Sequence, residues 1–66
     1  MKLEIGSVVK FGYNGKVREV KIEVVKTGGW VNPKPVLITG WDFRADGMRG
    51  AYRSFKVENM RALAVA

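Results

Sequence analysis

The chain has 66 residues, with 12 Lys plus Arg against 6 Asp plus Glu and a formal net charge of +6. This length allows one domain with a thin core, since so small a domain buries only about 60% of its unfolded surface. Cys and His are both absent, which removes disulfides, thiolate ligands, the commonest general base and the commonest metal ligand. We therefore expect no catalytic activity, no cofactor and no metal site.

The positive charge indicates the class of partner. A surplus of this size favours polyanions such as nucleic acids, although net charges of about 2 to 8 are also normal for small soluble domains. No apolar run approaches the roughly 20 residues of a membrane span. The first residues, MKLEIGSVV, lack the apolar core of a signal peptide. The sequence thus predicts a cytoplasmic protein without a membrane partner.

The first half of the chain has the pattern of a β-hairpin. Residues 7–13, SVVKFGY, are rich in β-branched and aromatic side chains. Asn14 and Gly15 follow, and both tolerate the positive φ angles of a type I′ turn. Residues 16–26 then alternate apolar and charged side chains, which predicts a strand with one wet face. Its apolar face is expected to hold Val20, Ile22 and Val24.

The second half predicts three more strands, over residues 36–43, 51–57 and 61–66. Thr27, Gly28 and Gly29 end the preceding strand. Residues 30–35, WVNPKP, form a connector because each proline removes a ladder donor. Gly40 indicates a bulge or bend inside its strand, and residues 44–50 form a polar turn. Five short strands in one small domain predict an all-β fold, a small five-stranded antiparallel barrel of the SH3/Sm-like kind.

Residues 36–60, VLITGWDFRADGMRGAYRSFKVENM, combine aromatic and basic side chains around a Gly-containing loop. Such a composition is typical of surfaces that bind nucleic acid, because rings stack on bases and cations contact phosphates. The expected nucleic-acid-binding residues are Arg53, Lys56, Arg44, Arg49, Tyr52 and Trp41.

Each candidate also has a purely structural interpretation. Arg53 shares the nominal inward side of its strand with Phe55, so its guanidinium either contacts a ligand phosphate or pairs with Asp42 or Glu58. Trp41 is a core residue or a stacking platform. Tyr52 alternates with Phe55 and is expected on the exposed side, whereas Phe11, Phe43 and Phe55 are expected in the core.

Two segments resemble the WYL domain family. The first is Leu37-Ile38-Thr39-Gly40-Trp41-Asp42, and the second is Arg53-Ser54-Phe55-Lys56-Val57-Glu58-Asn59-Met60. Of the tripeptide that gives the family its name, only Leu37 is present. The resemblance implies an SH3/Sm-like barrel that binds nucleic acid, often single-stranded DNA, through basic residues near the second segment. A free-standing domain of this kind implies a regulatory protein of phage or mobile-element origin.

The leading hypothesis is therefore a non-catalytic nucleic-acid-binding module that prefers single-stranded DNA or RNA. The alternative is a protein-interaction module that docks a host or regulatory protein through its barrel edge or through the region of Trp30. A homodimer is compatible with either function, because the two-sided apolar strand at residues 36–43 offers surface that a second copy would cover.

Overall fold

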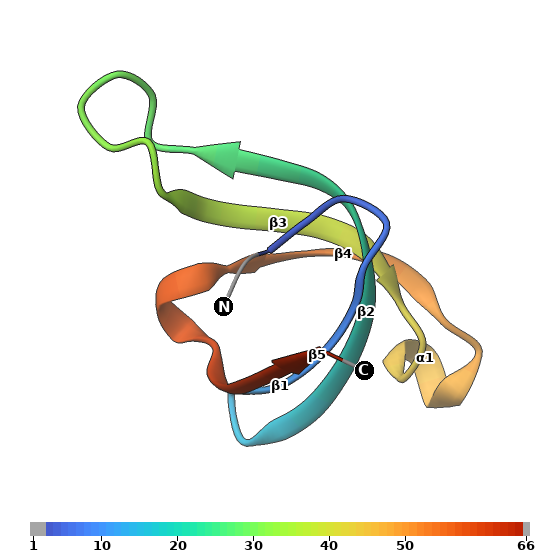
Figure 1. Cartoon of the computed structure of the whole chain (residues 1–66). Helices are drawn as coiled ribbons and strands as arrows, with labels where there is room; N and C mark the ends of the chain where they lie inside the picture. Colours follow the sequence, from blue (N-terminus) through green and yellow to red (C-terminus); the bar gives the residue numbers. More distant parts are fainter. Residues whose placement is uncertain (1–2, 66) are drawn as a thin grey trace.

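The computed structural model describes residues 3–65, which form one antiparallel sheet of five strands (Figure 1). The single-turn helix α1 (Ala45–Met48) and the 3-10 turn η1 (Val57–Asn59) connect the later strands. The five strands are β1 (Val8–Tyr13), β2 (Lys16–Thr27), β3 (Pro35–Asp42), β4 (Ala51–Lys56) and β5 (Arg61–Val65). The expectation of an all-β, five-stranded antiparallel fold is confirmed. Ala66, the last residue of the expected fifth strand, lies outside the described residues.

The strands lie in the order β4-β3-β2-β1-β5. The first four follow the chain as a meander, and β5 then returns to pair with β1 on the far side. β4 and β5 are therefore the two edges, and within residues 3–65 no backbone pairing joins them. The sheet is curled, with β2 bending along its length (Figure 1), so its concave side encloses the core.

The β1–β2 hairpin forms as the sequence predicts. Asn14 and Gly15 occupy the turn with φ angles of 51° and 77°, which is the left-handed region that this turn requires. The register pairs Val9 with Val20, and both side chains are fully buried. The apolar half of the alternating pattern thus reaches the core from both strands.

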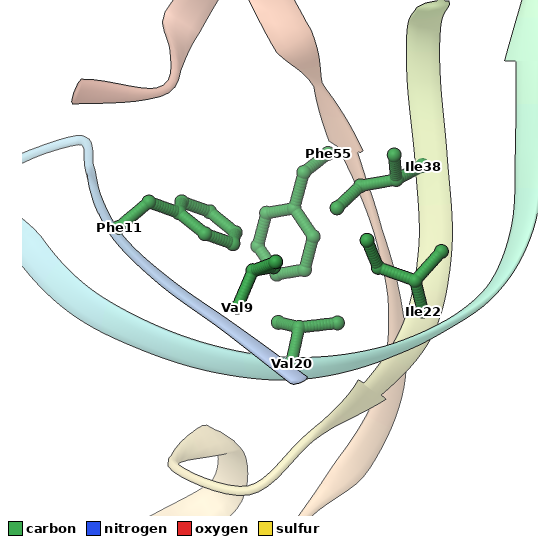
Figure 2. Packing of buried hydrophobic residues seen from close by; sticks show 6 residues of the cluster. All are labelled: Val9, Phe11, Val20, Ile22, Ile38 and Phe55. Carbon is green, nitrogen blue, oxygen red and sulfur yellow. The ribbon is translucent and has the colours of Figure 1, made fainter. Parts of the chain in front are cut away.

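A small cluster of aliphatic and aromatic residues fills the concave side. Figure 2 shows the ring of Phe55 in the middle of this cluster, with the Phe11 ring beside it. The two centroids lie 5.2 Å apart with an interplanar angle of 81°, the edge-to-face geometry that aromatic pairs prefer. The core consists of Val9, Phe11, Val20, Ile22, Ile38 and Phe55. Phe43 is not part of it, contrary to expectation: it follows the end of β3 and is 39% exposed.

A β-bulge in β2 changes which side chains of this strand face the core, so the predicted apolar face is wrong in part. Ile22 pairs with Gly40, but the next partner of β3, Thr39, pairs with Val24. Glu23 is therefore an extra residue, and side-chain alternation shifts by one position after it. As a result Val24 is exposed and Val25 packs against the core. The irregularity expected near Gly40 is present, with its additional residue on β2.

Helix α1 is a tight turn, in agreement with the predicted polar turn. Asp46 and Gly47 both have positive φ angles, 54° and 67°, which Asp and Gly tolerate better than most residues. Over residues 3–65 the fold contains no helix long and apolar enough to cross a lipid bilayer.

Candidate nucleic-acid interface

The convex side of strands β2, β3 and β4 carries three transverse rows of side chains. Because successive residues of a strand point to opposite faces, the neighbours of the core residues on these strands lie on this side. We call it the outer face. The strand register aligns its rows as Lys21–Trp41–Tyr52, Val24–Thr39–Ser54 and Lys26–Leu37–Lys56.

The first row contains the aromatic pair that the sequence singles out. The rings of Trp41 and Tyr52 lie 5.1 Å apart, at an interplanar angle of 81°. Tyr52 is 62% exposed, whereas Trp41 is half-buried. Gly50, with φ at 89°, lies directly beneath the Trp41 ring, since a Cβ atom added there would come within 2.6 Å of it. The backbone of the α1–β4 connection thus packs against the indole. The Tyr52 ring meets the indole in an edge-to-face arrangement.

Hydroxyl and ammonium groups occupy the other two rows. The Thr39 and Ser54 hydroxyls form a hydrogen bond of 2.8 Å. The three lysines of the outer face, Lys21, Lys26 and Lys56, are exposed. A lysine ammonium is a mobile point charge on a flexible stem, so these groups suit contacts with a polyanion whose shape varies.

Glu23, the bulged residue, places a carboxylate beside the aromatic pair. It raises the pKa of the Tyr52 hydroxyl above the usual value of 10.0, mainly through a side-chain hydrogen bond and further through its negative charge. The bulge thus places a carboxylate among the lysines of the outer face. The negative charge of this carboxylate would repel a phosphate group.

Replacing Glu23 with Gln is expected to lower the pKa of Tyr52 towards its usual value. The folded-state pKa of Tyr52 is raised, so the contribution of this contact to stability is present below pH 10 and is lost as the pH rises through the folded-state pKa. The Tyr52 ring-carbon chemical shift, followed by NMR against pH, measures the change. An unchanged pKa in the Glu23→Gln variant would show that Glu23 does not act on this hydroxyl.

The six predicted site residues do not form one cluster. Trp41, Tyr52 and Lys56 lie together on the outer face. Arg53 is exposed but alternates with Tyr52 and so points from the opposite side of β4. The Arg44 guanidinium lies 3.7 Å from the Glu19 carboxylate, which offsets its charge. Arg49, directly after α1, is exposed.

Asp42 is the one fully buried charged residue among residues 3–65. Its Oδ2 atom lies 3.5 Å from Nη1 of Arg18, and its Oδ1 atom accepts a hydrogen bond of 2.9 Å from the backbone N–H of Arg44. The ion pair considered for Arg53 with Asp42 is therefore made by Arg18 instead. A role of Arg53 in phosphate contact stays a prediction.

Sequence reasoning missed Lys21 and Lys26. Both belong to a strand whose wet face alternates in sign, Glu19, Lys21, Glu23, and this pattern argues against an anion site. The bulge changes that pattern, because it brings Lys26 into the row of Leu37 and Lys56. The only signal for this change in the sequence is Gly40, which indicates a bulge. It does not specify which of the two paired strands holds the extra residue.

Comparison of the chain with protein-family models, with curated proteins and with solved structures finds no match in any of the three.

Proposed function

We propose that this protein is a non-catalytic nucleic-acid-binding module that prefers single-stranded DNA or RNA. The observation that carries the proposal is the outer face, where an accessible aromatic pair lies in line with Lys21 and two rows, or four residues along β3 and β4, from the row of Lys26 and Lys56. Stacking on a ring contributes about 1–3 kcal/mol per base, and each lysine releases counterions from a phosphate backbone.

A single strand fits this face better than a duplex. The bases of a duplex are already stacked on one another, whereas the unstacked bases of a single strand are free to pack on aromatic side chains. The exposed ring of Tyr52 offers such a surface. The Thr39 and Ser54 hydroxyls add donors and acceptors without specifying one base, which supports binding with little sequence preference.

We also propose that the curled sheet is an SH3/Sm-like barrel related to the WYL domain, acting as a regulatory module. The support is the strand order, in which a four-stranded meander is followed by the short turn η1 and by a last strand beside the first. The second segment of the resemblance, residues 53–60, spans the end of β4 and all of η1. Lys56 in this segment borders the outer face.

Binding of a labelled single-stranded oligonucleotide is expected to weaken with salt. The logarithm of the association constant falls with the logarithm of salt concentration by about 0.7 per neutralised phosphate for single strands. Lys56→Gln should therefore reduce this slope by about 0.7. Fluorescence anisotropy across a salt series measures it.

Lys16→Gln is the matched control, since it removes the same charge from the start of β2, next to the β1–β2 turn. The two variants share their net charge, so only a contact at Lys56 separates them. Absence of salt-sensitive binding by the unmodified protein, or equal slopes for the two variants, would count against the proposal.

A protein-docking role is the second candidate. It is favoured by Trp30 and Val31, whose side chains are exposed on the loop that projects from the sheet between β2 and β3 (Figure 1). Exposed aromatic residues commonly anchor protein interfaces. A pull-down from nuclease-treated lysate separates the two functions, because a directly bound protein partner persists and a nucleic-acid-bridged one is lost.

A further inference from the structure

The loop of residues 28–34 joins β2 to β3 and forms an arm beyond the body of the sheet (Figure 1). Its Trp30 side chain is 104% exposed and that of Val31 is 97% exposed. The arm is closed by hydrogen bonds of its own, from the Gly28 N–H to the Lys34 carbonyl oxygen at 3.4 Å and from the Lys34 N–H to Asn32 Oδ1 at 3.2 Å. These contacts brace the backbone of the arm, while the Trp30 side chain extends from it with no intramolecular packing.

A groove of about 540 Å³ lies between the base of this arm and the end of β4. Its volume falls within the range of about 300–1,000 Å³ that is usual for ligand sites. Pro35, Leu37 and Val57 are among its apolar lining residues, and its polar lining residues are Asn32, Lys34, Lys56 and Glu58. An apolar floor between two ammonium groups suits a flat base joined to an anionic backbone.

The groove adjoins the outer face. Leu37 and Lys56 form the third row of that face and also line the groove. Glu23 lies at the start of this route, beside Tyr52. Beyond it the charge favours an anion, because residues 24–41 contain two lysines and no Asp or Glu. Glu58 is the one acidic residue that lines the groove, which is also lined by two lysines. The same charge disfavours a second copy of this chain as the occupant, since each copy carries +6.

We propose that a single strand runs from the Trp41–Tyr52 pair along β3 and β4 into this groove, and that Trp30 stacks on a base at the far end. This inference rests on the proposed function and adds its second contact. Residues 35 and 41 are separated by about 20 Å at the rise of a β-strand. A stacked strand advances about 3.4 Å per nucleotide, so the route requires about six nucleotides before it reaches the arm.

The test compares two thymidine oligonucleotides, one of about four and one of about ten nucleotides, shorter and longer than this route. Trp30→Ser and Lys34→Gln are each expected to weaken binding of the longer one, by about tenfold for Trp30. Binding of the shorter one should be unchanged, because the aromatic pair and the lysines of the outer face hold it without the arm. Lys16→Gln is again the charge control. In the unmodified protein, only the longer oligonucleotide should shift the NMR signal of the Trp30 indole N–H.

The outcomes distinguish the two proposals. If the unmodified protein binds neither oligonucleotide, the nucleic-acid function and the arm contact both fail. If it binds both and Trp30→Ser leaves the affinity for the longer one unchanged, the arm contact alone is wrong. Loss of a captured protein partner with unchanged oligonucleotide binding would assign Trp30 to protein docking instead.

Discussion

Replacing Gly40 with Ala is expected to destabilise the fold by at least about 3 kcal/mol, at the upper end of the usual cost of overpacking. A Cβ atom at this position would overlap the carbonyl oxygen of Lys21 and approach Val20. Backbone atoms of β2 cannot move aside as the end of a flexible side chain can. The β2 bulge and the β2–β3 pairing must therefore change, and chemical denaturation with the fluorescence of both tryptophans measures the loss.

Gly12→Ala is the matched control for this prediction. Gly12 also lies within a strand, β1, but a Cβ atom there would meet only ordinary contacts with Arg61 at 3.7 Å. We expect this change to alter the free energy of unfolding by no more than about 1 kcal/mol. Equal effects of the two substitutions would show that strand glycines are costly to replace here for a reason other than the close approach of β2 to Gly40.

Replacing Tyr52 with Ser is expected to weaken single-strand binding about tenfold, within the range of about 1–3 kcal/mol for loss of one stacked base. Because the side chain is 62% exposed and lies on the edge strand β4, its removal should leave the core intact. Tyr52→Phe keeps the ring and removes only the hydroxyl, so its affinity should stay close to that of the unmodified protein. Anisotropy titrations at one fixed salt concentration compare the three proteins.

A loss of affinity in Tyr52→Phe as large as in Tyr52→Ser would contradict the stacking account. It would assign the effect to the hydroxyl, which the Glu23 carboxylate already engages. Val17→Ser, which shortens an exposed apolar side chain in the first hairpin, controls for a general effect of removing exposed apolar surface.

Local patterns in the sequence predicted most of the secondary structure. The Asn14-Gly15 pair specified the first hairpin, because few residue pairs accept two positive φ angles. The β-branched and aromatic runs specified the strands. The prediction for Phe43 was wrong, because its hydrophobicity indicates burial but it directly follows Asp42. Asp42 points inward and is buried, so strand alternation directs the next residue to the outer side.

The features that decide the candidate site depend on contacts between distant segments. The bulge at Glu23 follows from the absent side chain of Gly40, 17 positions along the chain, and it alone aligns Lys26 with Leu37 and Lys56. The ion-pair partner of Asp42 is Arg18. The alternation of side chains along the strands could not distinguish Arg18 from Arg53 as that partner. The sequence predicts only a connector around Trp30, because Gly and Pro indicate turns. These residues do not indicate how far the loop projects from the sheet.

The most direct test of the account is an amide and indole NMR map of the protein titrated with a single-stranded oligonucleotide. The account predicts that the perturbed signals follow the outer face, with Trp41, Tyr52, Ser54 and Lys56 among them, and that they diminish at high salt. Perturbations confined to the opposite end of the sheet, around Val17 and Ala64 beside the β1–β5 pair, or no perturbation at low salt, would contradict it.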